Sequence, residues 1–135
     1  TLAAHVFCED LTRRSIRAAR RRYREGDLKP RLRVYHGDNT DGAFWGWNDV
    51  WLHADFVHWD IKGSLAGIRV PLLAIQGTDD PYGSQAQLDA IAELGGAAVA
   101  VAAVPGCAHA PHLEKTDLVL DAIAEFVDRH IRIGG

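Results

Sequence analysis

Two residues that can exchange protons follow two apolar segments, each just after the segment ends. Asp80 comes after the apolar run at 70–76, and His109 comes after the run at 98–104. Short apolar runs of this kind predict buried strands. In a hydrolytic triad, a histidine takes a proton from the nucleophile and an aspartate fixes the tautomer of the imidazole. The pair therefore predicts acid–base chemistry, with His109 as the general base and Asp80 as the orienting carboxylate.

Each of the two residues has a neighbour of the same kind. Asp79 directly precedes Asp80 in a turn, and His112 follows His109 by three positions. Acidic residues in turns are often only solvated, and a loop histidine is often an ordinary surface residue. Residue type and position alone leave Asp79 and His112 open as alternatives.

From residue 70 onward the apolar pattern alternates between strands and helices. A helix capped by Ser84 is expected after the first strand, and a helix beginning near Thr116 is expected after the second. This alternation predicts an α/β fold with a parallel sheet and right-handed crossovers. Functional residues gather at the carboxyl ends of the strands in such sheets. Asp80 and His109 both belong to that edge.

The N-terminal part of the chain has a different pattern. An amphipathic helix is expected over 11–25 and a shorter one over 29–35. The stretch 36–60 is expected to be irregular, because it is rich in Trp, Gly, Asn and Asp. We therefore expect three parts: the end of a core strand at 1–8, a helical cap or lid at 9–68, and a C-terminal α/β core segment at 69–135.

The segments that carry the acid and the histidine also resemble a known family. The matching residues are VPLLAIQGTDDP from Val70 to Pro81 and VPGCAHAPHLE from Val104 to Glu114. Over essentially its whole length the chain resembles the C-terminal half of an α/β-hydrolase-fold enzyme. The resemblance implies a partial α/β-hydrolase fold: the last parallel strands of the sheet, their flanking helices, and an inserted helical cap.

The resemblance also implies which residues act. Family members place the triad acid three residues after the glycine that ends the strand, here Gly77, which favours Asp80 over its neighbour. The position just before Ala110 and Pro111 favours His109 over the later histidine. The family nucleophile usually lies earlier in the chain, on a Gly-x-Ser-x-Gly turn, and this sequence contains no such motif.

No residue of the chain itself fits the role of nucleophile. Ser84 is the expected N-cap of its helix, and Cys107 is too close to His109 in sequence to present its sulfur to that ring. The resemblance then implies a nucleophile in the missing N-terminal half of the fold, as a partner of this chain. The expected function is that of the C-terminal part of a hydrolase acting on ester or related carbonyl-adjacent bonds. The alternative is a non-catalytic, small-molecule-binding or degenerate homologue.

A group of aromatic residues lies where family members insert the cap. Six of them are expected to line an apolar pocket for a small-molecule substrate: Phe44, Trp45, Trp47, Trp51, Phe56 and Trp59. The same residues would equally serve as the core of a small cap, which has few other large apolar side chains to bury. Both interpretations stay open at this stage.

The first helix is rich in arginine, a feature of many nucleic-acid-binding proteins. These arginines are Arg13, Arg14, Arg17, Arg20, Arg21, Arg22 and Arg24. The rest of the chain is acidic and no nucleic-acid-binding motif accompanies them, so we expect a solvated cap face and no nucleic-acid partner. His109 and His112 lack a nearby third ligand, so no metal is expected, and no cofactor either.

The composition excludes several classes of protein. The chain has 135 residues, a net charge of −3 and 47% apolar residues, with no apolar run long enough to cross a bilayer. Cys8 and Cys107 are too few for a disulfide framework and lack the spacing of a zinc site. No signal peptide is visible. We expect a cytoplasmic protein without a membrane partner.

Overall fold

A computed structural model describes residues 1–96 and 98–130, which form two compact units. One unit combines Thr1–Phe7 with the chain from Asp60 onward, and the other is Cys8–Trp59. The cap was expected to extend to residue 68, whereas the segment 60–68 groups with the sheet. The last five residues of the expected core segment, 131–135, lie outside the described residues.

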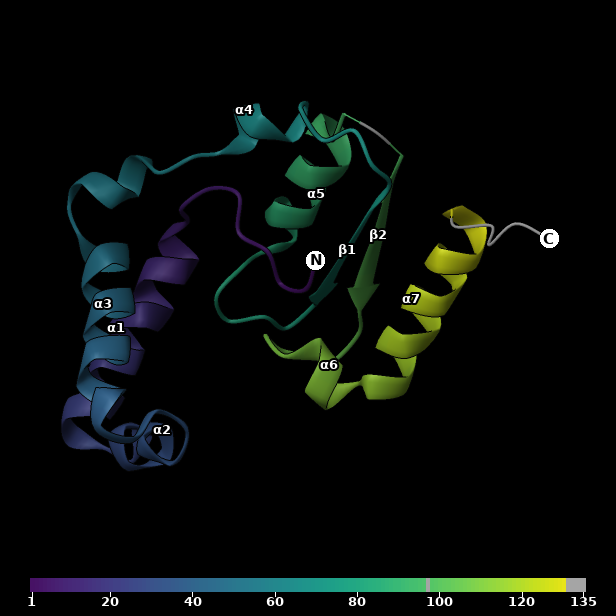
Figure 1. Cartoon of the computed structure of the whole chain (residues 1–135). Coiled ribbons are helices and arrows are strands. Elements are labelled where there is room, and N and C mark those ends of the chain that lie inside the picture. Colours follow the sequence, from purple (N-terminus) through teal and green to yellow (C-terminus); the bar gives the residue numbers. More distant parts are fainter. Residues whose placement is uncertain (97, 131–135) are drawn as a thin grey trace. The chain divides into compact units, whose positions relative to one another are not determined.

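The first unit is built on two parallel strands, β1 (Leu72–Gly77) and β2 (Val99–Val104), as the alternating pattern predicts. The helix α5 (Gln85–Leu94) connects them. Figure 1 shows α5 on one side of this sheet and α7 (Thr116–His130) on the other. Two shorter helices, α4 (Lys62–Leu65) and α6 (Pro111–Glu114), complete the unit.

Alternating side chains of β1 enter two separate cores. On one face, Ala74 packs in a cluster with Ile91 of α5. On the other, Ile75 packs with Val104 and with Val119 of α7. Because helices cover both faces, β1 needs apolar residues at consecutive positions, which explains its continuous apolar run.

The N-terminal segment was expected to be the end of a core strand, and the structure has a single parallel bridge there, between Leu2 and Ile75. The backbone N–H of Ala3 donates to the Ile75 carbonyl (2.8 Å), and that of Ile75 donates to the Thr1 carbonyl (2.9 Å). Ala3 has a φ of 48°, in the left-handed region, which interrupts the extended backbone. The segment therefore lies along the edge of β1 opposite β2 without forming a longer strand.

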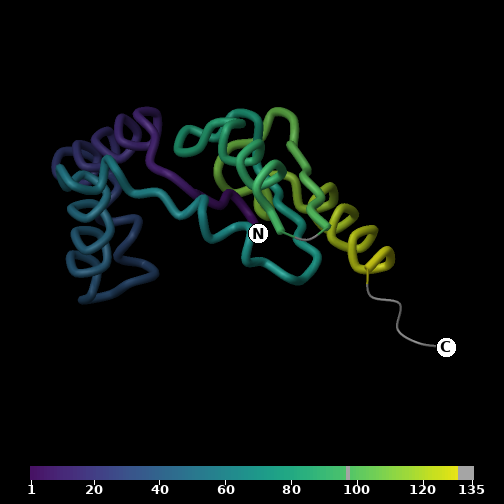
Figure 2. The backbone as a smooth tube through the Cα atoms, turned by 90° about the horizontal axis from the view of Figure 1, so that it is seen from above, coloured from purple at the N-terminus to yellow at the C-terminus, as the bar shows by residue number. Residues whose placement is uncertain are grey.

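The unit Cys8–Trp59 is helical. It contains α1 (Asp10–Glu25), α2 (Leu28–His36) and α3 (Thr40–Leu52), with 3-10 turns η1 (Gly37–Asn39) and η2 (Asp55–His58). Within this unit α1 and α3 lie side by side, as both views of the backbone show (Figures 1 and 2).

The expectation that 36–60 is irregular was wrong, because α3 occupies the middle of that stretch. Two contacts with α1 stabilise the helix. The ring of Phe44 stacks on Tyr23, with centroids 3.7 Å apart. The fully buried Asn48 donates to the Ile16 carbonyl (3.1 Å) and accepts from Arg20 (2.6 Å). These tertiary contacts outweigh the low helix propensity of the glycines and the asparagine.

Candidate active site

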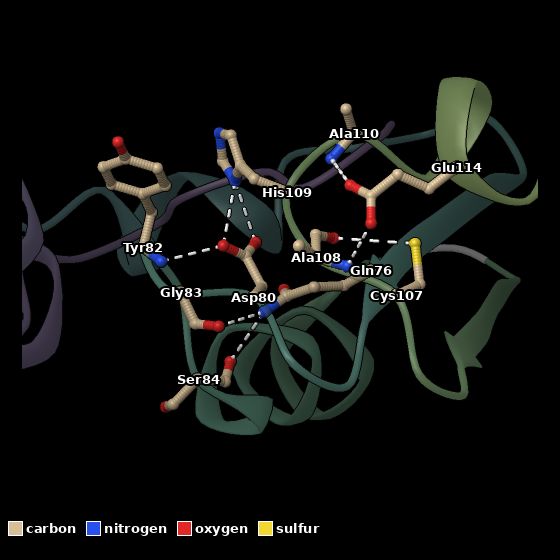
Figure 3. Close-up of polar contacts among 10 residues, drawn as sticks. All are labelled: Gln76, Asp80, Tyr82, Gly83, Ser84, Cys107, Ala108, His109, Ala110 and Glu114. Atoms are coloured by element: carbon tan, nitrogen blue, oxygen red, sulfur yellow. Dashed lines mark hydrogen bonds and ion pairs between the residues drawn. The ribbon is translucent and has the colours of Figure 1, made fainter.

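Asp80 and His109 meet at the carboxyl edge of the sheet. Asp80 lies in the turn after β1 and His109 in the loop after β2, and the two strands are parallel, so both turns open on the same edge. The Nδ1 atom of His109 is 2.8 Å from Oδ2 and 3.0 Å from Oδ1 of Asp80. Figure 3 shows the carboxylate beneath this ring nitrogen.

The two partners differ in their exposure to solvent. The Asp80 side chain is 1% exposed, whereas that of His109 is 43% exposed. Burial raises the pKa of the Asp80 carboxyl, but hydrogen bonds from His109 and from the backbone N–H of Tyr82 (2.8 Å) outweigh it, so the pKa lies below its usual range. The carboxylate is therefore ionised at neutral pH and accepts a proton-bearing nitrogen.

This arrangement fixes the chemistry of the imidazole. An ionised Asp80 favours the neutral tautomer with its proton on Nδ1, which leaves the lone pair on Nε2. Figure 3 shows Nε2 on the side of the ring away from Asp80. Within residues 1–96 and 98–130, no hydrogen bond to Nε2 is present. His109 can therefore take a proton at Nε2 while Asp80 stabilises the resulting charge.

Two glycines let the backbone bring the histidine loop to the end of β1. A Cβ atom on Gly77 would lie 2.1 Å from the Cys107 carbonyl oxygen and 2.2 Å from that of Ala108, so only glycine allows this approach. Gly106 has a φ of 58°, a conformation that favours glycine. Backbone bonds then join the two loops, with Asp79 N–H donating to the Cys107 carbonyl at 2.9 Å.

The alternative acid and base lie outside this contact. Asp79 is exposed, and its carboxylate accepts from the Thr78 hydroxyl at 3.2 Å. His112 is exposed in α6, where its backbone carbonyl accepts from the Thr116 hydroxyl. In the described part of the chain, neither side chain hydrogen-bonds to Asp80 or His109. The structure thus brings together the two residues that the family resemblance favours.

The chain was compared with known proteins. No protein-family model matches it, and no curated protein matches its sequence. Solved structures do match. They include a serine hydrolase involved in carbazole degradation (15% identity, TM-score 0.61, 94% of this chain and 52% of that one) and a meta-cleavage product hydrolase from Pseudomonas fluorescens (15%, 0.57, 95% and 54%). A proline iminopeptidase from Mycobacterium smegmatis also matches (16%, 0.52, 90% and 49%).

The chain has the fold of the C-terminal half of an α/β-hydrolase. It spans about half the length of the solved structures that it matches. At these sequence identities the likeness establishes the fold, and the parallel sheet with flanking helices agrees with it.

The aromatic residues of Cys8–Trp59 fall into two groups. Trp45 and Trp47 each pack edge-on against Phe44, which is 3% exposed and stacks on Tyr23. Trp51 belongs to a second group with Phe56 and Trp59, whose rings are stacked. Phe44 is therefore a core residue of this unit, and Trp47 is the most exposed of the six aromatic residues expected to line a pocket.

A pocket of about 510 Å³ lies in the same unit, beside the second aromatic group. Its lining residues are Asp49, Val50, His53, Asp55, Phe56, His58 and Trp59. None of Phe44, Trp45, Trp47 and Trp51 is among them. Of the six aromatic residues expected to line a pocket, this cavity therefore uses Phe56 and Trp59.

Several arginines of α1 have structural partners. Arg13 is 9% exposed, and its guanidinium donates to the carbonyls of Trp51 (2.9 Å), Leu52 and His53 at the end of α3. Arg20 pairs with Asp49 in the same unit. The role of Arg13 could not be predicted from the sequence, because an arginine that caps a different helix has no local signature.

Over 1–96 and 98–130, no group of three or more His, Cys, Asp or Glu side chains is arranged to hold a metal ion. Over the same ranges, none of the helices has both the length and the apolar character needed to cross a bilayer.

Proposed function

We propose that this chain supplies the acid and the base of a hydrolase that acts on ester or related carbonyl-adjacent bonds of a small molecule. The observation that carries the proposal is the hydrogen bond between the buried Asp80 and Nδ1 of the half-exposed His109. The fold supports it, since the matching structures include hydrolases of several kinds.

The proposed reaction follows from the tautomer of His109. A hydroxyl nucleophile attacks the substrate carbonyl and gives its proton to Nε2, and Asp80 stabilises the imidazolium that forms. The imidazolium then protonates the leaving-group oxygen of an ester. The bond between that oxygen and the carbonyl carbon breaks, and an acyl-enzyme remains. A water molecule next attacks the acyl group and gives a proton to Nε2. The imidazolium then returns that proton to the nucleophile as the acid product leaves. Each cycle consumes one water and restores the enzyme.

The nucleophile is proposed to come from outside these residues. The sequence has no Gly-x-Ser-x-Gly motif, and the matching structures contain about as much chain again. The partner of this chain is therefore the N-terminal half of the same fold, which would extend the sheet beyond the Leu2–Ile75 bridge. We propose further that exposed aromatic residues of Cys8–Trp59, such as Trp47, contact the substrate, and that neither nucleic acid nor a membrane is a partner.

A second candidate function is binding without chemistry. The absence of a nucleophile motif from the sequence favours it, because a degenerate homologue would keep the pocket of about 510 Å³ and lose turnover. The two functions differ in whether His109 matters. A binding protein would tolerate its loss, whereas a hydrolase would not.

The test compares His109→Ala with His112→Ala in the intact protein that carries this chain. With p-nitrophenyl esters as substrates, we expect His109→Ala to lower kcat by about a millionfold, as loss of the triad histidine does in subtilisin. His112→Ala, which removes an exposed ring from the same loop region, should leave kcat within about twofold.

The outcomes separate the two functions. Turnover that His109→Ala abolishes supports the hydrolase. Turnover that survives in His109→Ala overturns the proposed role of this histidine. An intact protein that binds esters, turns none of them over and is not labelled by a fluorophosphonate would be the binding homologue.

A further inference from the structure

The carboxylate of Glu114 holds the backbone on both sides of His109. Its Oε2 accepts from the N–H of Ala108 at 2.9 Å, and its Oε1 accepts from the N–H of Ala110 at 3.1 Å. Figure 3 shows the carboxylate between these two backbone groups, with His109 on the segment that joins them. One side chain thus binds the residue before and the residue after the proposed base.

This contact spans the part of the loop between its two backbone attachments. The first part of the loop is bound to the turn that follows β1. The Gly106 N–H donates to the Thr78 hydroxyl (3.1 Å), and the Cys107 carbonyl accepts from the Asp79 N–H (2.9 Å). At the other end, the Ala110 carbonyl accepts from the N–H groups of Leu113 (2.9 Å) and Glu114 (3.0 Å). Ala110 itself has φ −118° and ψ 62°, outside the regular helix and strand regions. A loop segment of this kind needs an external restraint to hold one conformation.

The two bonds from Glu114 provide that restraint. They fix the peptide groups at the start and the end of the three-residue segment centred on His109, and so limit the direction of its Cα–Cβ bond. The N–H groups of Ala108 and Ala110 hold the pKa of the Glu114 carboxyl below its usual range, so the carboxylate is ionised at neutral pH. Both hydrogen bonds are therefore charge-assisted. Glu114 is itself the last residue of α6, which starts directly after Ala110, so the loop and its restraint form one local unit.

We propose that Glu114 is a positioning residue for His109, holding the imidazole at the distance and angle that its bond to Asp80 requires. The inference rests on the proposed role of His109 as the general base. Glu114 takes no part in proton transfer, because its two oxygens are engaged by backbone N–H groups. Its effect on the reaction passes through the backbone to the ring.

The experiment uses Glu114→Ala and Glu114→Gln in the intact protein, with Glu125→Gln as the matched control. The first variant removes both acceptors. The second keeps one acceptor oxygen and places an amide N–H group, itself a donor, against the other backbone donor. Glu125 is an exposed residue of α7. The readouts are kcat, KM and the downfield proton resonance of the His109 Nδ1–H, assigned by its absence in His109→Ala.

We expect Glu114→Ala to lower kcat about a hundredfold, because misplacement of a catalytic group by about 1 Å has an effect of this size. Glu114→Gln should lower kcat about tenfold, as loss of one hydrogen bond would. KM should change less than kcat, and the Nδ1–H resonance should shift or broaden in both variants. Glu125→Gln should leave all three readouts unchanged.

The opposite result overturns the inference. If both Glu114 variants keep the wild-type Nδ1–H resonance and kcat, Glu114 does not position the ring, whatever they do to the melting temperature. If Glu114→Ala fails to fold, Glu114→Gln decides by the same two readouts. Failure of the proposed function has a different signature, since His109→Ala would then retain turnover.

Discussion

The buried carboxylate of Asp80 places both of its oxygens within 3.0 Å of Nδ1 of His109. The bond links a residue that follows β1 to one that follows β2, and it leaves Nε2 on the side of the ring away from Asp80 (Figure 3). In the proposed hydrolase, the acid that is 1% exposed would stabilise charge and the base that is 43% exposed would meet the substrate.

Asp80→Asn should lower kcat strongly in the intact protein. The amide can present an N–H group to Nδ1, which favours the tautomer with its proton on Nε2 and removes the lone pair that acts as base. The equivalent change in a serine protease costs about ten-thousandfold in kcat. Asp79→Asn, one residue earlier and exposed, serves as the control and should stay within about twofold. A larger loss in Asp79→Asn than in Asp80→Asn would show that Asp79, and not Asp80, is the orienting acid.

The position of this pair could be predicted from the sequence, because parallel strands that follow one another end at one edge of the sheet. The choice of Asp80 over Asp79 needed the family resemblance, since both aspartates share one turn. Glu114 could not be predicted as a positioning residue. Its role depends on the path of the backbone from Ala108 to Ala110, which no periodicity encodes.

The helical unit was harder to predict for a related reason. The helix α3 contains Gly42, Gly46 and Asn48, so local propensity argues against it, and contacts with α1 decide. The aromatic residues raise the same difficulty. Core and pocket use the same side-chain types, and only the packing of Phe44 on Tyr23 shows that Phe44 belongs to the core.

The stability of the sheet unit should depend on pH through Asp80. Its pKa is lower in the folded state than in the unfolded chain, because His109 and the Tyr82 N–H bind the ionised form. The stabilisation is therefore fully present above the unfolded pKa of about 3.9 and is lost as the pH falls through the lower folded value. Urea denaturation of wild type and Asp80→Asn from about pH 7 to about pH 3 measures it. The difference in free energy of unfolding should shrink below about pH 4, and a constant difference would contradict the prediction.

Arg13→Ala should destabilise the unit Cys8–Trp59. The last carbonyls of a helix have no partner within it, and Arg13 donates to three carbonyls at the end of α3. We expect a loss of about 1–3 kcal/mol in the free energy of unfolding. All four tryptophans lie in this unit, so their fluorescence reports its unfolding directly. Arg17→Ala removes an exposed arginine of the same helix and should change the value by less than about 0.5 kcal/mol. Equal effects of the two variants would show that general charge on α1, and not the contact of Arg13, stabilises the unit.

Gly77→Ala should disturb both the stability of the sheet unit and the geometry of its acid–base pair. The added methyl group would lie 2.1 Å from the Cys107 carbonyl oxygen, so the loop that carries His109 must move away from β1. We expect a loss of more than about 2 kcal/mol in the free energy of unfolding, followed by far-UV circular dichroism because this unit contains no tryptophan. The Nδ1–H resonance of His109 should shift in the folded fraction.

Gly63→Ala is the matched control for Gly77→Ala, because a Cβ there meets nothing within 4 Å and alanine favours the helix α4 that contains it. Gly63→Ala should therefore be neutral or slightly stabilising. If Gly77→Ala were as stable as Gly63→Ala and kept the His109 resonance, the loop would not need the close approach to β1 that places His109 beside Asp80.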